Sequence, residues 1–367
     1  MLSTQTLTDV VPEHIDDRGR QTSRHISAKG PDNMLRTRFT EEFGIEHPIV
    51  CGGMTGVGTA PLISAVAEAG ALGFLAALTQ PTPAALDEEI RRTKSMTSRP
   101  FGVNLTVLPT VNPVPYAEYR QVIIDNEIPI VETAGSNPAE HVAAFKAAGI
   151  RVIHKAVAVR HSLSAQRLGV DAISVDGFEC AGHPGEDDIP SMVLVPAVSA
   201  KVDIPTIASG GFATGAGLVA ALALGASAVN FGTRFVATVE APVHDNVKQQ
   251  IVTNTERDTS LVFRKFRNTA RVAKNAVAEE IRTIEARPEA TFDDIAHLAS
   301  GVRGRQSVLA EGQMDDGLWW AGQSQGLINE VLTCKEVVDS VIADAAYLIE
   351  FGLPSLRYRD TASMPTA

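Results

Sequence analysis

Residues 204–234 read IPTIASGGFATGAGLVAALALGASAVNFGTR, and this stretch decides the fold class. Its two apolar runs are separated by a helical stretch, and each run leads into a glycine-containing loop, SGGF at 209–212 and GTR at 232–234. Gly225 follows the helical stretch, where a left-handed residue often ends a helix. Apolar runs that alternate with helical stretches are typical of parallel strands joined by crossover helices. The stretch therefore predicts a strand–helix–strand unit of a parallel α/β fold.

The same alternation extends along the chain and gives eight apolar runs. The predicted strands lie at 47–51, 72–76, 101–106, 128–132, 151–154, 172–175, 204–208 and 228–231. The helical stretches between them include 60–69, 83–93, 139–148 and 215–224. Eight parallel strands with intervening helices are the number that closes a (β/α)8 TIM barrel. An open doubly wound sheet is the alternative, but the first loop, GGMTG at 52–56, lacks the G-x-G-x-x-G motif that such a sheet favours.

We expect three segments along the chain. Residues 1–35 are polar, have no sustained apolar period and are interpreted as a flexible N-terminal arm. Residues 36–240 form the predicted barrel domain. Residues 241–367 form a helical elaboration that covers the active face and supplies a final amphipathic helix at 336–349, after a helical run at 269–285. The added helices could equally form a homodimer interface.

Composition excludes several classes of partner. The chain has 367 residues, 44% of them apolar, which is enough for a large core. A net charge of −11 without a dense Lys/Arg stripe argues against nucleic acid and anionic membranes as partners. No apolar run approaches a membrane span, and the N-terminus lacks the pattern of a secretory signal. Cys51, Cys180 and Cys334 are widely spaced and predict neither a disulfide framework nor a zinc site, which favours a cytoplasmic protein.

Glycine-rich loops follow the seventh and eighth predicted strands, where (β/α)8 barrels usually bind phosphate. Gly210 and Gly211 lie in the first loop, and Gly232 and Thr233 lie in the second. Glycines let backbone N–H groups approach a phosphate closely, and a helix N-terminus adds favourable partial charge. Tight turns alone would explain either loop, but two such loops in these two places favour a phosphate-bearing ligand.

Polar side chains end four other predicted strands. Asn104, Glu132, Lys155 and Asp176 follow strands three, four, five and six. Asn104 and Lys155 suit hydrogen bonding to the polar edge of a flavin ring. A cation near the pyrimidine end would stabilise the reduced, anionic flavin. Together with the phosphate loops, these side chains suit a ligand that carries both a phosphate and a flavin ring.

The loop at 176–188, DGFECAGHPGEDD, is the strongest local signal. His183 is best suited to proton transfer near neutral pH, although a surface histidine is the alternative. Cys180 could act as a nucleophile at the same strand end, but the Gly-Ser-x-Cys-x-Thr loop of barrel dehydrogenases that attack a purine is absent. The carboxylates at 186–188 could ligate a metal, although consecutive carboxylates more often cap a following helix, here the one after Pro190.

Several motifs together resemble the nitronate monooxygenase family, formerly called 2-nitropropane dioxygenases. They are PIVCGGM at 48–54, GVNL at 102–105, HK at 154–155, VRH at 159–161, the loop through His183, ASGG at 208–211, FGTRF at 231–235 and AGQ at 321–323. The resemblance covers about residues 36–350. It implies an FMN-containing barrel in which the cofactor is surrounded by Met54, Asn104, Lys155, Ala181, Gly182, Gly211, Gly232 and Thr233. It also implies that His183 is catalytic. We add Gly53, Thr55, Asp176 and Gly210 to the predicted cofactor site.

The wording CAGHPGEDD at 180–188 resembles the branch of the family described as NADH:quinone reductases. The sequence therefore predicts an FMN-dependent oxidoreductase that uses NAD(P)H as electron donor and a quinone as small-molecule substrate. The alternatives are a nitronate monooxygenase that uses O2, an FMN-dependent enoyl reductase and, in another class, a flavin-free phosphosugar isomerase or aldolase. In the nucleotide-dependent version we expect residues 300–326, with Arg303, Arg305 and Gln323, to meet the pyrophosphate.

Overall fold

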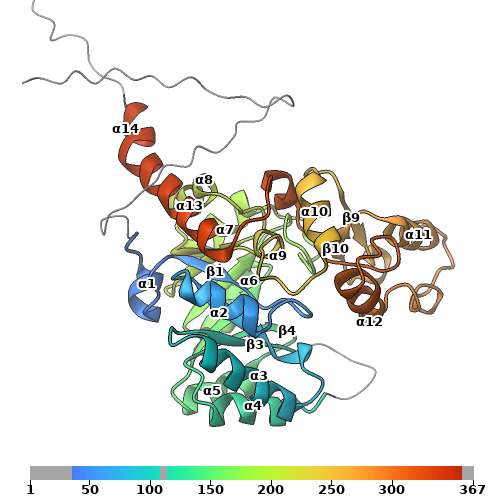
Figure 1. Ribbon diagram of the computed structural model, residues 1–367, viewed down its shortest axis with the longest axis horizontal. Helices are drawn as coiled ribbons and strands as arrows, with labels where there is room; N and C mark the ends of the chain where they lie inside the picture. The colour runs from blue at the N-terminus through green and yellow to red at the C-terminus, as the bar shows by residue number, and fades with distance from the viewer. Residues whose placement is uncertain (1–34, 108–113, 358–367) are drawn as a thin grey trace, which may run out of the picture.

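The eight predicted strands form a closed parallel barrel in the computed structural model, which describes residues 35–107 and 114–357 (Figure 1). Each strand pairs with its neighbour in sequence, and the last pairs with the first. The strands are β1 (Ile49–Cys51), β2 (Leu72–Ala76), β3 (Gly102–Val107), β4 (Ile130–Gly135), β5 (Arg151–Ala156), β6 (Ala172–Asp176), β7 (Thr206–Ser209) and β8 (Ala228–Asn230). The TIM-barrel prediction is therefore confirmed.

Three strands begin two residues later than predicted, and a proline explains each case. Pro48, Pro129 and Pro205 directly precede β1, β4 and β7. Proline has no N–H to donate to a strand ladder, although its carbonyl still accepts. The three carbonyls accept from Val229, Arg151 and Ile173 respectively, so each proline contributes only one side of the pairing.

Helices between the strands cover the outside of the barrel. They are α2 (Ala60–Glu68), α3 (Pro83–Met96), α4 (Tyr116–Asp125), α5 (Ala139–Ala147), α6 (Val159–Arg167), α7 (Ser191–Ser199) and α8 (Gly215–Ala223). The eighth covering helix is α13 (Cys334–Tyr347), which packs against α8 and α2. Before β1, α1 (Arg38–Phe43) contributes Phe39 and Phe43 to the apolar cluster inside the barrel. Within the described residues, no helix is both long and apolar enough to cross a bilayer.

The barrel interior changes from apolar to polar along the strands. Val50, Ile153, Ile207 and Ala228 belong to the interior apolar cluster. The residues two positions further along the same strands line a cavity, and they are Gly52, Lys155, Ser209 and Asn230. Alternate residues of a strand point to the same face, so each strand supplies one core residue and one site residue. This period-two pattern places the polar strand ends in a single layer above the core.

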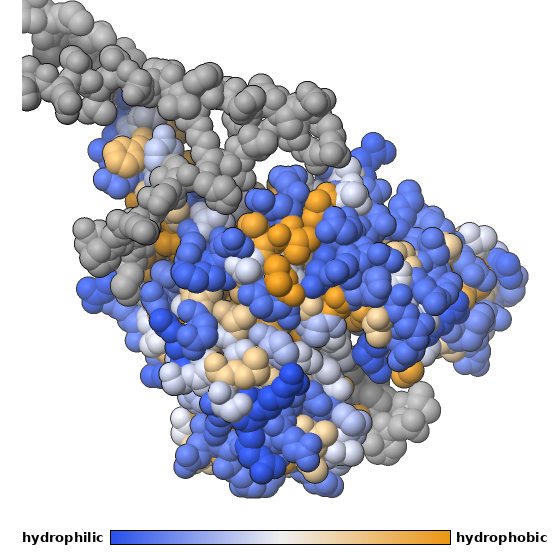
Figure 2. All heavy atoms as spheres, viewed as in Figure 1, coloured by the Kyte–Doolittle hydropathy of each residue, from blue (hydrophilic) through white to orange (hydrophobic). Residues whose placement is uncertain are grey.

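The chain after β8 forms an insertion before the last barrel helix. Short α9 (Thr233–Val236) is followed by α10 (Asp245–Thr253), the antiparallel hairpin of β9 (Thr259–Val262) and β10 (Ala270–Ala273), α11 (Ala276–Glu285) and α12 (Gly301–Arg303). The hairpin, α11 and α12 lie to one side of the barrel (Figure 1), where the hairpin and α11 pack around an apolar cluster of their own, whereas the buried residues of α9 and α10 belong to the main core. Their outer surface is largely hydrophilic (Figure 2). The remaining helical turns are η1 (Ala77–Thr79), η2 (Arg264–Phe266), η3 (Phe292–Asp294), η4 (Gly304–Ala310), η5 (Gln323–Leu327), η6 (Leu348–Gly352) and α14 (Leu353–Ser355).

One predicted helix is wrong in part, because its first residues form β10. The helical run expected at 269–285 becomes a strand up to Ala273 and a helix only from Ala276. The side chain of Asn275 accepts from Ala278 N and caps the helix, so the helix starts after it. A short apolar run does not distinguish strand from helix, and the pairing with β9 decides the outcome. The predicted arm at 1–35 lies outside the described residues except for its last residue.

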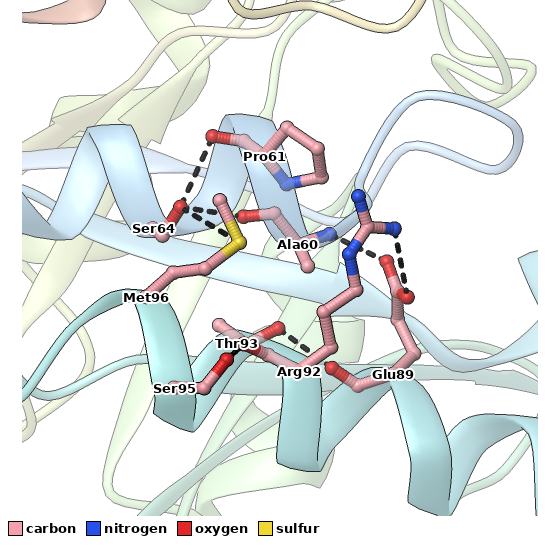
Figure 3. Close-up of polar contacts among 8 residues, drawn as sticks. All are labelled: Ala60, Pro61, Ser64, Glu89, Arg92, Thr93, Ser95 and Met96. Atoms are coloured by element: carbon pink, nitrogen blue, oxygen red, sulfur yellow. Dashed lines mark hydrogen bonds and ion pairs between the residues drawn. The ribbon is translucent and has the colours of Figure 1, made fainter.

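A side chain from α3 caps the start of α2. Glu89 Oε1 accepts a hydrogen bond of 2.6 Å from the backbone N–H of Ala60, the first residue of α2 (Figure 3). The residue before the helix, Thr59, makes no side-chain capping bond of its own. Arg92 lies 3.5 Å from the same carboxylate and helps to hold it in place. A carboxylate at a helix N-terminus satisfies an orphan donor and complements the helix dipole.

We expect Glu89→Ala to lower the free energy of unfolding by about 1 kcal/mol, the usual cost of removing a helix cap. Equilibrium urea denaturation followed by circular dichroism measures this change. Glu88→Ala is the matched control, because Glu88 is the exposed neighbour on the same helix and its loss should change stability by less than about 0.5 kcal/mol. Equal losses in the two variants would contradict the capping role.

Candidate active site

A cavity of about 810 Å³ opens at the carboxyl ends of the barrel strands, which is where barrel enzymes place their active sites. The loops after the strands form one part of its wall, and the insertion forms another. The residues that the sequence predicted to hold the cofactor, together with His183, all line this cavity: Gly53, Met54, Thr55, Asn104, Lys155, Asp176, Ala181, Gly182, His183, Gly210, Gly211, Gly232 and Thr233. The structure therefore brings together residues that are spread over most of the barrel.

The loops after β7 and β8 present backbone donors that the protein itself does not use. Among the described residues, the N–H groups of Gly210, Gly211 and Gly232 have no hydrogen-bond acceptor. Gly210 and Gly211 have φ values of 90° and 82°, a region that favours glycine. Gly232 has φ −97°, and a Cβ there would meet nothing closer than Met54 Sδ at 3.9 Å. Neither backbone conformation nor packing requires glycine at 232, so a ligand explains it better.

The cavity floor is built around the carboxylate of Glu132, which is fully buried. Its Oε1 accepts from Gly53 N at 3.1 Å and from Asn104 Nδ2 at 2.7 Å. Asn104 Oδ1 in turn accepts from the hydroxyl of Thr106 at 2.8 Å, which fixes the amide orientation. A Cβ at Gly53 would lie 2.2 Å from Asn104, so glycine is needed for this close approach. Asn104 is therefore held rigidly at the cavity surface.

Lys155 is the cation that acts on this carboxylate. Its Nζ lies 3.6 Å from Asp176 Oδ2, and both side chains are largely buried. Burial alone would lower the pKa of Lys155, but the Asp176 and Glu132 carboxylates outweigh it and raise that pKa above its ordinary value. Burial raises the pKa of Glu132, whereas Lys155 and the Gly53 N–H oppose that rise. Lys155 therefore stays charged at the floor of the cavity.

Asn230 completes the floor on the side of β8. Its Oδ1 accepts from Gly52 N at 2.8 Å, and its Nδ2 donates to Ser209 Oγ at 3.1 Å. His154, behind Lys155, is buried, and burial lowers its pKa to about 4. Its Nδ1 lies 2.9 Å from the hydroxyl of Thr133. His154 is therefore neutral, and Lys155 is the charged group of β5 at the site.

His183 lies at the mouth of the cavity, where its ring is exposed. The indole of Trp320 from the insertion is its aromatic neighbour, with 5.9 Å between ring centres. Although the residue has exposed surface, the protein atoms packed around its imidazole remove water from it, and this desolvation lowers the pKa of His183, whereas Glu186 opposes that shift. The imidazole is therefore neutral at pH 7, and it can accept a proton from a molecule in the cavity.

The carboxylates that follow His183 join this loop to the insertion. Glu186 accepts from Thr269 N at 2.8 Å and from Thr269 Oγ1 at 2.5 Å. Asp188 accepts from both terminal nitrogens of Arg264, at 3.1 and 2.7 Å. These contacts fix the β9–β10 hairpin to the loop that carries His183. Paired N–H donors on one carboxylate are among the strongest side-chain contacts available.

The helix-capping interpretation of the acidic run at 186–188 is therefore wrong. The start of α7 is capped by Glu179, whose carboxylate accepts from Ser191 N at 3.2 and 3.0 Å. Asp187 pairs instead with Arg160 at 2.9 Å. Among the residues that the structure describes, no group of His, Cys, Asp and Glu side chains is arranged to hold a metal. The three carboxylates of the run instead bind residues that are distant in the sequence. A run of acidic residues looks the same in the sequence whether it makes such contacts or caps a helix.

A family model described as nitronate monooxygenase matches residues 36–344. A dehydrogenase of Rhodococcus jostii, named (3aS,4S,5R,7aS)-5-hydroxy-7a-methyl-1-oxo-octahydro-1H-indene-4-carboxyl-CoA dehydrogenase, is 33% identical over 86% of this chain and 97% of its own. FabK from Thermotoga maritima superposes with a TM-score of 0.81 at 34% identity, covering 88% of this chain and all of that one. Nitroalkane oxidase from Streptomyces ansochromogenes gives 0.71 at 29%, covering 84% and 98%.

The chain belongs to the nitronate monooxygenase family. The family predicted from the motifs is confirmed, and the chain is an oxidoreductase enzyme. Enzymes of the nitronate monooxygenase family depend on flavin. The unused N–H groups at 210, 211 and 232 and the fixed polar atoms of Asn104 and Lys155 fit such a cofactor, because they offer donors for a phosphate and for a polar ring edge.

The nitronate monooxygenase scaffold also brings residues to the cavity that the sequence reading missed. These are Asn230 on β8, the hairpin residues Arg267, Asn268 and Thr269, and Trp320. The motif AGQ at 321–323 was the one local signal near Trp320. Arg303 and Arg305, expected to meet a pyrophosphate, do not line the cavity, and Gln323 lines a separate groove. Arg303 donates to the carbonyl of Asp316, so it is occupied within the insertion.

Cys180 faces the cavity, but its surroundings do not suit a nucleophile. The thiol is buried, and burial, with a contribution from Asp176, raises its pKa well above the ordinary value despite Lys155. A thiolate is the reactive form, so Cys180 is held in its inert state at neutral pH. Cys51 and Cys334 are also buried and have raised pKa values.

We expect the folded protein to release no fast equivalent of nitrothiobenzoate from Ellman's reagent at pH 8, because all three thiols are buried and protonated. After denaturation in guanidinium chloride, Cys51, Cys180 and Cys334 should react together. Absorbance at the thionitrobenzoate band measures both states. One rapid equivalent in the native protein that disappears in Cys180→Ser would restore Cys180 as a candidate nucleophile.

Proposed function

We propose that this protein is an FMN-dependent oxidoreductase that exchanges a hydride with a nicotinamide nucleotide and acts on a CoA thioester. The observation that carries the cofactor assignment is the set of unused backbone donors at 210, 211 and 232 beside a floor of fixed polar side chains. Bound FMN would supply two-electron redox chemistry. The choice of a nicotinamide nucleotide as electron donor is supported by the loop at 180–188, which resembles the NADH:quinone reductase branch of the family.

The residues of the chain divide the binding of FMN between them. The N–H groups of Gly210, Gly211 and Gly232 would hold the phosphate, and the N-terminus of α8 adds favourable partial charge. Asn104 and Lys155 would hold the polar edge of the ring system. Because Lys155 stays charged, it would favour the reduced, anionic form of the cofactor. Met54 and Gly53 would contact the ring from the loop after β1.

His183 is the residue that we propose to move a proton. Its neutral imidazole stands at the cavity mouth, where an organic substrate would lie over the cofactor. A neutral imidazole can accept a proton from the substrate carbon or return one to it. The carboxylate contacts of Glu186 and Asp188 with the hairpin hold the His183 loop in position. These contacts favour a fixed orientation of the ring.

The CoA thioester is favoured by a relative and by the shape of the cavity. The relative from Rhodococcus jostii is named as a carboxyl-CoA dehydrogenase. Beyond the predicted cofactor residues, the cavity continues along the loop after β4 and along α6, with Ser136, Asn137, His161 and Leu168 in its wall. A mixed apolar and polar extension suits a long, flexible substrate better than a small nitronate.

A quinone is the second candidate substrate, favoured by the wording of the loop at 180–188. Trp320 is 39% exposed at the cavity mouth, beside His183. An exposed indole next to an imidazole offers a surface on which a planar ring can stack. The same mouth would admit a nitronate with O2 as acceptor, so substrate tests must include all three classes.

Gly232→Leu tests where the phosphate binds. The φ of Gly232 is negative, and a Cβ there has no close neighbour, so the variant should fold. Its side chain would occupy the proposed phosphate position, so the variant should lose most of its FMN. Flavin released by heat and measured by absorbance gives the stoichiometry, and circular dichroism checks the fold. Gly217→Ala in α8 is the control and should retain FMN, because a Cβ there meets only ordinary contacts from 3.4 Å. Full FMN content in Gly232→Leu would sink the placement.

Anaerobic reduction with separate donors tests the reaction. NADH or NADPH should bleach the bound flavin, and an α,β-unsaturated CoA thioester or a quinone should reoxidise the reduced enzyme by accepting a hydride and a proton. His183→Ala should slow the thioester step by about 10²- to 10⁴-fold without loss of flavin. His297→Ala, an exposed histidine of the insertion, should have no effect. The rate of the wild-type thioester step should rise as pH falls, since the proton that His183 gives to the substrate carbon is present only in its acid form, which the lowered pKa makes scarce at neutral pH. Bleaching by a nitronate alone would overturn the proposal.

A further inference from the structure

The turn of the β9–β10 hairpin places an arginine at the cavity. Arg267 lies in this turn and lines the cavity together with Asn268 and Thr269. Its guanidinium is exposed and has no hydrogen-bond or carboxylate partner among the described residues. It is the only guanidinium in the described part of the cavity wall. Neither the proposed binding of FMN nor the proposed proton transfer by His183 involves Arg267.

The backbone at Arg267 is held in an uncommon conformation. Its φ is 55°, in the left-handed region that residues other than glycine and asparagine rarely adopt. Phe263, at the other end of the same turn, has φ 65° and is buried in the cluster of the insertion. Such conformations persist when surrounding contacts impose them, and they are concentrated at ligand-binding positions. Here the turn directs a charged residue toward the cavity.

The contacts that impose this conformation lie on both sides of Arg267. Three residues before it, Arg264 is bound by Asp188, and two residues after it, Thr269 is bound by Glu186. Both carboxylates belong to the loop that carries His183. The turn between Arg264 and Thr269 is therefore fixed at two points to the catalytic loop, and Arg267 is pre-positioned relative to His183 despite its exposure.

The charges that face the cavity leave Arg267 without a counter-ion. Lys155, the other permanent cation of the wall, is paired with Asp176. Glu186, another carboxylate of the cavity wall, already accepts two hydrogen bonds from Thr269 of the hairpin. The two histidines at the mouth, His161 and His183, have lowered pKa values and are neutral at pH 7. An anion entering the mouth would meet one fixed, unneutralised positive group.

We propose that Arg267 binds the diphosphate of an ADP-bearing cosubstrate at the mouth of the cavity. The guanidinium fork matches two phosphate oxygens at once, and diphosphate is the anionic part that nicotinamide nucleotides and CoA thioesters share. The inference rests on the proposed function, because it supplies the recognition of the cosubstrate that the reaction needs. Arg267 thus takes the part that the sequence assigned to Arg303 and Arg305.

Binding of ADP itself tests the inference without turnover. In titration calorimetry of the FMN-loaded enzyme, Arg267→Gln should raise the Kd for ADP by about 10- to 100-fold. Arg267→Lys should give an intermediate loss, because a lysine keeps the charge but not the fork. Arg257→Gln is the matched control, an exposed arginine of the same insertion that lines the separate groove and should bind ADP as the wild type does. The affinity of the wild type should also fall with added salt more steeply than that of Arg267→Gln.

Truncated ligands identify which cosubstrate meets Arg267. If Arg267 binds the diphosphate of the nicotinamide nucleotide, the Kd ratio between Arg267→Gln and wild type should be large for NADH. The ratio should be near one for reduced nicotinamide mononucleotide, which lacks the diphosphate. The same comparison between a CoA thioester and its pantetheine analogue reports on the thioester. If ADP does not bind the wild type, or if Arg267→Gln binds ADP and both cosubstrates as the wild type does, the inference is wrong. Flavin that no nucleotide reduces, with ADP binding still dependent on Arg267, would refute the proposed reaction and leave the diphosphate site standing.

Discussion

The site depends on one buried carboxylate. Glu132 has no solvent exposure, and through its Oε1 it holds both the backbone of Gly53 and the side chain of Asn104. A buried carboxylate is costly unless a cation and hydrogen bonds compensate for the water it loses. Lys155 and the two donors compensate only in part, since the pKa of Glu132 is still raised and its Oε2 has no hydrogen-bond partner among the described residues, and in return the carboxylate helps to keep Lys155 charged. The polar floor is therefore a set of mutually dependent groups.

Above this floor, the barrel and the insertion supply different parts of the cavity wall. The barrel contributes the glycine loops and the polar strand ends, and the insertion contributes Trp320 and the hairpin turn. The two parts meet at the loop after β6, where Gly182 and Arg271 exchange backbone hydrogen bonds of 3.0 and 2.6 Å. The carboxylates of Glu186 and Asp188 extend this contact.

Local patterns were enough to find the strands and the loops after them. A short apolar run that ends in a glycine-containing loop is a property of neighbouring residues, and so is the glycine pair at 210–211. The same reasoning failed at 269–285, because the residues of β10 are strand only through pairing with β9. It failed again at 186–188, because a carboxylate run looks the same whether it caps a helix or binds a distant arginine. Pro48, Pro129 and Pro205 were visible in the sequence and could have corrected the strand starts.

The sequence by itself determined the barrel, the family and the residues that surround the cavity floor, because each of these is specified by short motifs at the ends of regular elements. Only the tertiary structure decided what faces that floor. Glu186 and Thr269 are 83 residues apart, and Gly322 N reaches Thr233 Oγ1 across 89 residues. Which residues come into contact over such separations depends on how the whole chain packs. The local spacing of apolar residues in the sequence carries no information about these contacts. Arg267 at the mouth is a product of that packing, since its position follows from contacts made by its neighbours.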